Sequence, residues 1–187
     1  MPRTKKFNPH QVLDQATEVF AKQGYYGVSM SLLVERLAIN RASLYGTFGD
    51  KERLYRQCLY RYVQVWPVPQ QNGSDLGVMD LLEAICKRYY AHPEARGCFL
   101  LKSGSEVGAE FPEISALVRD YYLEVEKSFK GCLENDAKSG VIPKIASSKD
   151  GARYLVNQCF GMHVHALLSP DHKRSHEILT QALALLT

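Results

Sequence analysis

Apolar residues recur at helical spacing along most of the chain, and this periodicity restricts the fold more than any other feature of the sequence. In segment 112–139, large apolar side chains fall on or near one face of a helix: Ile114, Leu117, Val118, Tyr121, Tyr122, Val125, Phe129 and Leu133. No segment shows the sustained period-two alternation of a half-buried strand, and no internal repeat is visible. The chain is therefore predicted to be all-α.

Capping residues mark four helices in the first third of the chain. Asn8 and Pro9 suit the N-cap and the first helical position of a helix over 8–24 that ends at Gly24. A short helix then begins at Ser29 or Ser31 and ends at about Ala38. The sequence Ile39-Asn40 breaks it, and Asn40 caps a third helix over 41–48. Asp50 caps a fourth.

The rest of the chain alternates long helical patterns with breaks. Residues 66–77 contain Pro67, Pro69 and Gly73 and are predicted to form a loop. The other predicted breaks contain Gly or Pro at 92–93, 104–112, 140–143 and 169–170. The last two helices are predicted over about 148–168 and 171–186.

Positive charge is concentrated in the first third of the chain. The protein has 187 residues and a net charge of +3. Residues 1–63 hold ten Lys or Arg against five Asp or Glu, whereas residues 64–187 hold thirteen against fifteen. Only the first part is therefore expected to meet a polyanion. We predict a DNA-binding domain over 1–61 and a larger helical domain over 62–187.

Composition excludes several other classes of protein. Hydrophobic residues make up 45% and charged residues 23% of the chain, which is typical of a soluble globular protein. No apolar run approaches the ~18 residues of a membrane span, and nothing resembles a signal peptide, so a cytoplasmic location is expected. The five cysteines form no Cys-x-x-Cys pair, so we expect free thiols and neither a metal nor a cofactor.

Two short helices joined by a sharp turn are typical of a helix-turn-helix, whose second helix enters the major groove. The helix over 41–48 is the candidate reading helix, with Leu44 and Phe48 facing inward. Its small or hydrogen-bonding side chains are expected to contact DNA in the groove: Arg41, Ser43, Tyr45 and Thr47. Phosphate contacts are predicted from Lys6, Ser31 and Lys51.

The run from Val28 to Lys51 resembles the tetracycline-repressor (TetR) family of bacterial regulators. The family places a Leu-Tyr pair and a Phe in the reading helix and a Lys after the next turn, which match Leu44, Tyr45, Phe48 and Lys51. Many members have glycine where this chain has Ala38. The resemblance implies a regulator, most often a repressor and not an enzyme, that binds a near-palindromic operator as a homodimer.

The resemblance also implies a dimer interface on the last two helices and a small-molecule effector among the middle helices. Apolar residues suited to the interface are Leu155, Met162, Ala166, Ile178, Leu179, Ala182, Leu183 and Leu186. Residues suited to the effector pocket are Trp66, Tyr89, Tyr90, Cys98, Phe99, Lys102, Phe111, Tyr121, Tyr122 and His163. For each aromatic residue taken alone, ordinary core packing is the competing interpretation.

Three alternatives remain open at this stage. Cys98 follows Gly97 at a predicted helix start with Lys102 four residues on, a setting that favours the thiolate, so a redox- or electrophile-sensing repressor is one hypothesis. A DNA-binding protein without an effector is another. An enzyme is a more distant one, because Cys159 and His163 share a face without an orienting third group. His172 and His176 are spaced to share a metal, although such a pair near a terminus is usually idle.

Overall fold

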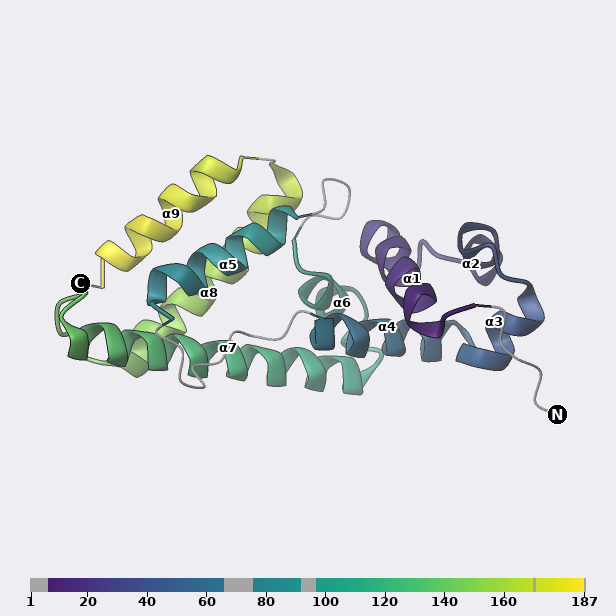
Figure 1. Ribbon diagram of the computed structural model, residues 1–187, viewed down its shortest axis with the longest axis horizontal. Coiled ribbons are helices and arrows are strands. Elements are labelled where there is room, and N and C mark those ends of the chain that lie inside the picture. Colours follow the sequence, from purple (N-terminus) through teal and green to yellow (C-terminus); the bar gives the residue numbers. More distant parts are fainter. Residues whose placement is uncertain (1–6, 66–75, 92–96, 170, 187) are drawn as a thin grey trace. The chain divides into compact units, whose positions relative to one another are not determined.

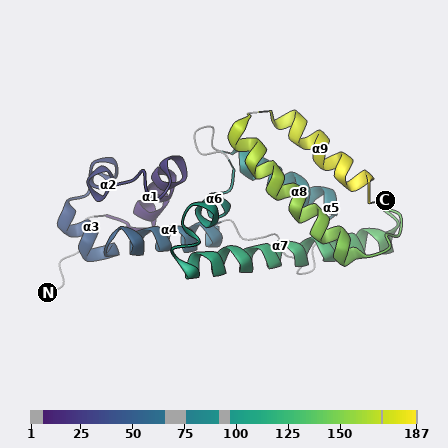
Figure 2. The same cartoon turned by 180° about the vertical axis from the view of Figure 1, so that it is seen from behind.

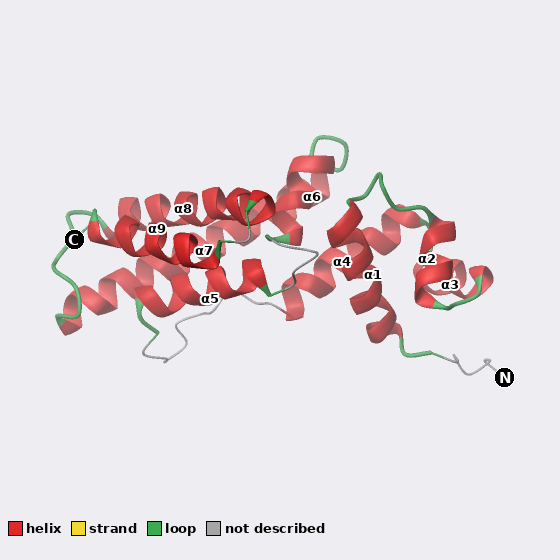
Figure 3. Ribbon diagram, turned by 90° about the horizontal axis from the view of Figure 1, so that it is seen from above, coloured by secondary structure: helices red, strands yellow, loops and turns green. Residues whose placement is uncertain are grey.

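A computed structural model describes residues 7–65, 76–91, 97–169 and 171–186, and in these ranges the regular structure is helical without strands (Figures 1 and 3). The prediction of an all-α chain is confirmed. The helices are α1 Pro9–Gln23, α2 Met30–Leu37, α3 Arg41–Phe48, α4 Lys51–Val65, α5 Val78–Tyr90, α6 Phe99–Val107, α7 Pro112–Ser139, α8 Ser148–Leu168 and α9 His172–Ala184. None of the described helices combines the length and the apolar character that a membrane-spanning segment requires.

The chain forms two compact units. The first comprises Met1–Pro67 with Lys102–Ile114, and the second comprises Val68–Leu101 with Ser115–Thr187. A segment that follows the predicted DNA-binding domain by forty residues therefore returns to pack with it. Helix α6 carries the chain from the second unit into the first. The functional division between residues 61 and 62 stays a prediction.

Local capping explains why α1 to α4 begin where the sequence predicts. Each cap side chain accepts a hydrogen bond from a backbone N–H two or three residues on: Asn8 from His10 (2.9 Å), Ser29 from Leu32 (3.1 Å), Asn40 from Ser43 (2.8 Å) and Asp50 from Arg53 (2.8 Å). Ser29 is therefore the cap of α2, and Ser31 lies inside that helix. Gly24 ends α1 with a φ of +75°.

Ala38 ends α2 in the left-handed region, with φ +51° and ψ +36°. Among the described residues it is the one non-glycine with a positive φ. This backbone conformation costs an L-residue roughly 1–2 kcal/mol. A glycine at this position would relieve that cost.

Buried aromatic and aliphatic side chains join the helices of the first unit. Tyr55 of α4 is fully buried and makes edge contacts with the rings of Phe20 (centroids 4.8 Å apart) and Tyr25 (5.0 Å). Its hydroxyl donates to Ser103 Oγ at 2.6 Å. Leu33 of α2 and Leu44 of α3 are also fully buried. The short helices, which would be unstable alone, are held by this core.

In the second unit, α9 packs against both α8 and α5, and α5 packs against α8 (Figures 1 and 2).

The predicted long helix over 112–139 is confirmed as α7. The predicted break over 104–112 starts too early, because α6 continues through Gly104 to Val107. The N–H of Gly108 still donates to the carbonyl of Gly104 at 3.1 Å, so this glycine lies inside a helical turn.

Candidate nucleic-acid interface

Helix α3 is anchored on one side and exposed on the other. Leu44 and Phe48 are buried in the first unit, whereas Arg41, Tyr45 and Gly46 are exposed. The guanidinium carbon of Arg41 lies 5.5 Å from the centre of the Tyr45 ring, which is within the range of a cation–π contact. Among the described residues, α3 therefore presents a face of small and hydrogen-bonding side chains.

Gly46 lies in the middle of this exposed face, and a Cβ added there would meet no atom of the described chain within 4 Å. Glycine in a helix interior is unfavourable by roughly 1 kcal/mol relative to alanine. We expect Gly46→Ala to raise the free energy of unfolding by about 0.5–1 kcal/mol. If α3 enters the major groove, the added methyl lowers operator affinity at the same time. Urea unfolding and DNA titration of one sample measure both, and equal operator affinity would contradict close approach at Gly46.

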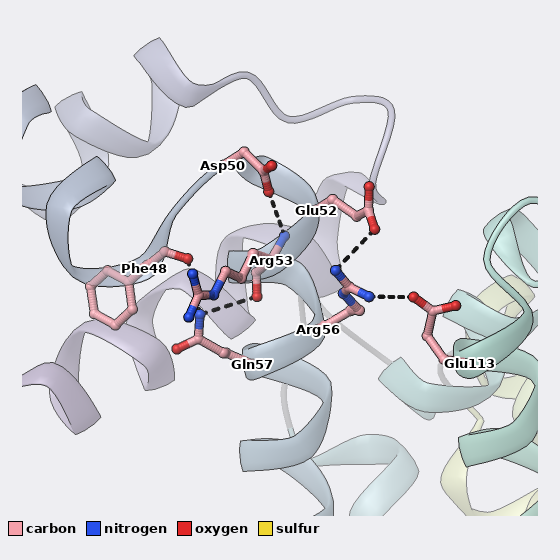
Figure 4. A network of polar contacts seen from close by, with 7 residues as sticks. All are labelled: Phe48, Asp50, Glu52, Arg53, Arg56, Gln57 and Glu113. Carbon is pink, nitrogen blue, oxygen red and sulfur yellow. Dashed lines mark hydrogen bonds and ion pairs between the residues drawn. The ribbon is translucent and has the colours of Figure 1, made fainter.

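A polar network fixes the end of α3 to the start of α4 (Figure 4). The side-chain amide of Gln57 donates to the carbonyl of Phe48 at 3.0 Å and to that of Arg53 at 3.2 Å. Arg56 forms ion pairs with Glu52, at 3.1 Å, and with Glu113 of α7. The carbonyl of Phe48 lies at the C-terminus of α3 and has no partner within that helix. It therefore accepts a hydrogen bond from the neighbouring helix α4.

The predicted phosphate-binding residues occupy different settings. Ser31 is exposed near the start of α2, and Lys6 lies outside the described residues. The Nζ of Lys51 donates to the carbonyl of Tyr25 at 3.2 Å and lies 4.1 Å from the centre of its ring. The ammonium therefore stabilises the α1–α2 turn in this structure. A phosphate contact from Lys51 would have to compete with that bond. Ser43 and Thr47 are half-buried on α3.

The turn between α1 and α2 is held by side chains from α6, which sequence reasoning missed. Lys102 donates to the carbonyls of Ala21 (2.8 Å) and Lys22 (3.2 Å) at the C-terminus of α1. The carboxylate of Glu106 accepts from the N–H groups of Tyr25 (3.0 Å) and Tyr26 (3.2 Å). A Cβ on Gly24 would lie 2.5 Å from a carboxylate oxygen of Glu106, so this approach requires a glycine. We call Lys102 and Glu106 the α6 bracket.

The residues predicted for an effector pocket fall into separate groups. Trp66 lies outside the described residues. Lys102 and Phe111 belong to the first unit, where the ring of Phe111 lies 5.4 Å from that of Tyr25. In the second unit, the buried rings of Tyr89 and His163 lie 6.0 Å apart. The other members of that unit are Tyr90, Cys98, Phe99, Tyr121 and Tyr122.

Tyr121 and Arg88 form a polar contact within this aromatic part of the second unit. The guanidinium of Arg88 donates to the Tyr121 hydroxyl at 2.7 Å. Burial raises the pKa of Tyr121 to about 12, against the opposing effect of Arg88. The phenol is therefore neutral at physiological pH and available as a hydrogen-bonding group. Tyr122 makes an edge contact with Phe160 at 5.1 Å.

Cys98 occupies a setting different from the one proposed for a reactive thiol. Its side chain is 1% exposed, and its backbone N–H donates to Nδ1 of His163 at 2.8 Å. Lys102, expected to favour the thiolate, instead binds the carbonyls at the end of α1. All five cysteines lie in the described ranges, and all are buried without a disulfide. Reactivity at Cys98 would require an opening of this region.

The residues predicted for the dimer interface largely form the core of the subunit itself. Six of the eight are buried: Leu155, Met162, Ala166, Leu179, Ala182 and Leu183. Leu186 is half-buried, and Ile178 is 36% exposed. The exposed apolar side chains of α8 and of the segment 172–186 are Val164, Leu167, Leu168, Ile178 and Leu185. We call these five side chains the apolar α8–α9 face. Of the eight residues predicted for the dimer interface, this face contains Ile178 only.

The arrangement of α1 to α4 and the exposed face of α3 define a helix-turn-helix protein with a second, helical unit. Residues 12–58 match the sequence profile described as "Bacterial regulatory proteins, tetR family". In this segment the chain is similar to TetR-family transcriptional regulators, and its fold is similar to theirs.

Over most or all of its length, the chain is also similar to individual transcriptional regulators. The uncharacterized HTH-type transcriptional regulator YezE of Bacillus subtilis is 27% identical over 201 aligned positions that span both chains completely. The HTH-type transcriptional repressor ComR of Escherichia coli is 23% identical over 88% of this chain and 81% of its own. A cysteine-substituted form of the TetR family regulator CifR, solved with a 26-base-pair operator, has a TM-score of 0.83 and 23% identity. That comparison covers 99% of this chain and 100% of CifR.

Proposed function

We propose that the protein is a repressor that binds a near-palindromic operator as a homodimer and is released by a small-molecule effector. The exposed face of α3 is the observation that carries the proposal. Its anchors Leu44 and Phe48 are buried, whereas Arg41, Tyr45 and Gly46 of the same helix are exposed. Residues 1–61 bind DNA in this proposal, and residues 62–187 dimerise and sense the effector.

Arg41 is the residue we expect to read a base. It occupies the first position of α3, and its guanidinium can form a bidentate contact with a guanine edge. Ser43, Tyr45 and Thr47 supply further hydrogen-bonding groups along the same helix. Ser31 and the free N–H groups at the start of α4 suit phosphates, because a helix N-terminus attracts anions.

Fluorescence anisotropy on DNA from upstream of the protein's own gene tests the proposal, with random DNA of equal length at ~0.15 M salt as the reference. We expect specific DNA to bind more tightly by a factor of about 10³ or more. Arg41→Ala should cost about 1–3 kcal/mol and relax the preference at one base pair. Equal weakening on every DNA would place Arg41 on phosphate. Equal binding of the wild type to both DNAs would contradict a specific operator there.

For the homodimer, we propose that the apolar α8–α9 face meets its copy in a partner subunit. Exposed apolar side chains at 164, 167 and 168 form a stripe at helical spacing on α8, and Leu168 is 82% exposed. A two-fold interface uses the same patch on both subunits, and it would set two reading helices on successive major grooves ~34–36 Å apart.

Leu168→Glu should therefore convert the dimer to a monomer, because the substitution buries a charge twice in a two-fold interface. Sedimentation equilibrium at micromolar concentration measures the change. Val141, which is 72% exposed outside this face, provides the matched control Val141→Glu, which should leave the dimer intact. A dimer that survives Leu168→Glu but not Val141→Glu would place the interface elsewhere.

The effector is proposed to bind the second unit near Tyr89, Tyr121 and His163. These side chains offer aromatic surface together with hydrogen-bonding groups, which suits an amphipathic or aromatic molecule. An effector that prefers the form unable to bind DNA shifts the population toward it, and a coupling of ~1–3 kcal/mol weakens operator binding roughly 5- to 150-fold. A screen for compounds that raise the melting temperature and release operator DNA tests this part of the proposal.

A further inference from the structure

Two exposed side chains of α3, Arg41 and Tyr45, contact each other along the helix. They lie four positions apart, and the guanidinium carbon of Arg41 is 5.5 Å from the centre of the Tyr45 ring. Side chains on a helix lean toward its N-terminus, so the ring at position 45 extends toward the residue at position 41. The contact therefore follows from the spacing of the two residues on one helix and depends on no distant segment.

The backbone beneath the pair is fixed at both ends of α3. Asn40 caps the helix directly before Arg41, since its side chain accepts the N–H of Ser43 at 2.8 Å. At the other end, the carbonyl of Tyr45 accepts the N–H of Gly49 at 2.9 Å. The two side chains thus start from fixed backbone positions, so the ring of Tyr45 can restrict where the guanidinium lies.

The neighbours of the pair on the exposed face are small. Ala42 and Gly46 are both exposed, and each follows one member of the pair directly. A Cβ at position 46 would meet no atom of the described chain within 4 Å. The floor of a DNA groove can therefore approach the guanidinium and the ring together without a collision with these two neighbours.

A guanidinium that is already held loses less conformational entropy when it binds a base. The arginine side chain has many rotamers, and its immobilisation opposes binding. A cation–π contact requires the charge of the guanidinium and not its hydrogen bonds, so the N–H donors can still form a bidentate contact with a guanine edge. Exclusion of water from the groove also strengthens the contact with the ring.

We propose that Tyr45 is a positioning residue whose ring holds the guanidinium of Arg41 toward the base that this arginine reads. The inference rests on the proposed function, in which α3 lies in the major groove and Arg41 contacts a base. It adds a role for the ring that is separate from hydrogen bonding to DNA, because such a bond requires the hydroxyl alone. Tyr45 therefore contributes to specificity at a base pair that it does not need to touch.

Base discrimination tests the proposal on the duplex that the full-length wild-type protein selects from a randomised pool. Each base pair of that duplex is replaced in turn, and Arg41→Ala identifies the pair at which Arg41 discriminates. Tyr45→Leu should lower the discrimination at this pair by about three- to tenfold, as loss of a cation–π contact requires. Tyr45→Phe keeps the ring and should retain the discrimination of the wild type.

A double-mutant cycle separates positioning from two independent DNA contacts. In the Arg41→Ala background, Tyr45→Leu should change the discrimination at the same base pair by less than about twofold, because no guanidinium is left to position. Tyr60→Leu is the matched control, since Tyr60 of α4 is 52% exposed and its replacement also removes an exposed ring. This control should bind every duplex like the wild type.

Nuclear magnetic resonance of the free protein measures the contact without DNA. A ring current shifts protons that lie over an aromatic ring upfield. The δ-protons of Arg41 should therefore move downfield in Tyr45→Leu and keep their wild-type shifts in Tyr45→Phe. Shifts that are the same in the wild type and in Tyr45→Leu would contradict the contact itself.

Three DNA-binding results would overturn the positioning role. One is Tyr45→Leu with wild-type discrimination at the pair that Arg41 reads. Another is an equal loss of discrimination in Tyr45→Leu and Tyr45→Phe, which would assign the effect to the hydroxyl. The third is a loss of the same size with and without Arg41. All three leave the proposed function intact. A wild type that selects no sequence contradicts the proposed function, and Arg41→Ala that weakens every duplex equally contradicts its base contact; the inference falls with either.

Discussion

Replacement of Gly97 by alanine is expected to destabilise the protein by about 3 kcal/mol or more. Gly97 has a φ of +82°, which costs an L-residue roughly 1–2 kcal/mol. A Cβ there would also lie 2.5 Å from Nδ1 and 2.8 Å from Cε1 of the His163 ring. That ring is buried and accepts the N–H of Cys98, so it cannot turn away without loss of a hydrogen bond. Urea unfolding followed by circular dichroism measures the change.

Gly140→Ala is the matched control for Gly97→Ala. Gly140 also has a positive φ, +77°, but a Cβ there meets no atom within 4 Å. The control should lose only about 1 kcal/mol, which is the backbone contribution. The difference between the two variants therefore isolates the clash with His163. If the two losses are equal, the imidazole moves freely and does not hold the segment before α6.

Glu106→Ala is expected to lower the free energy of unfolding by about 2–3 kcal/mol. The carboxylate accepts two backbone N–H groups, from Tyr25 and Tyr26, and hydrogen bonds to charged groups are stronger than neutral ones. Without the carboxylate, the partly buried N–H of Tyr25 in the α1–α2 turn loses its hydrogen-bond acceptor. A partly buried donor without an acceptor lowers the stability of the folded state. Since this turn precedes the helix-turn-helix, operator affinity should fall as well.

Glu110→Ala is the control for Glu106→Ala. In the part of the chain that the structure describes, the Glu110 carboxylate accepts from the exposed hydroxyl of Tyr26, where water can replace it, so the loss of stability should be much smaller. Glu106→Gln keeps one acceptor oxygen and should fall between the alanine variant and the wild type. Chemical unfolding and operator titration of all three variants check this order. Equal stability of the two alanine variants would show that the α6 bracket does not hold the turn.

The helices of the DNA-binding part could be predicted because their signals are local. Asn8, Ser29, Asn40 and Asp50 lie within three residues of the N–H groups that they cap, so sequence order alone brings the partners together. The exposed face of α3 follows from the same helical geometry. The resemblance of residues 28–51 to the TetR family then suggested that this face contacts DNA.

Contacts between distant segments could not be predicted in this way. Glu106 follows Tyr26 by eighty residues, and no periodicity relates the two. Lys51 illustrates the same difficulty, because its position at a helix start predicts a phosphate contact but does not reveal the contact that its ammonium makes with Tyr25. In α8, periodicity identified an apolar stripe at 155, 162 and 166 but could not tell the core of the subunit from a surface that meets a partner.

The α6 bracket also determines how this regulator can be taken apart or recombined. A fragment that ends at residue 61 keeps every residue of the helix-turn-helix but leaves the carbonyls of Ala21 and Lys22 and the N–H groups of Tyr25 and Tyr26 without their side-chain partners. We therefore expect that residues 1–61 do not fold as an autonomous module. A chimaera that joins it to another sensing domain must carry residues 102–114 with it, so new specificities in this architecture require two segments of the gene to be exchanged together.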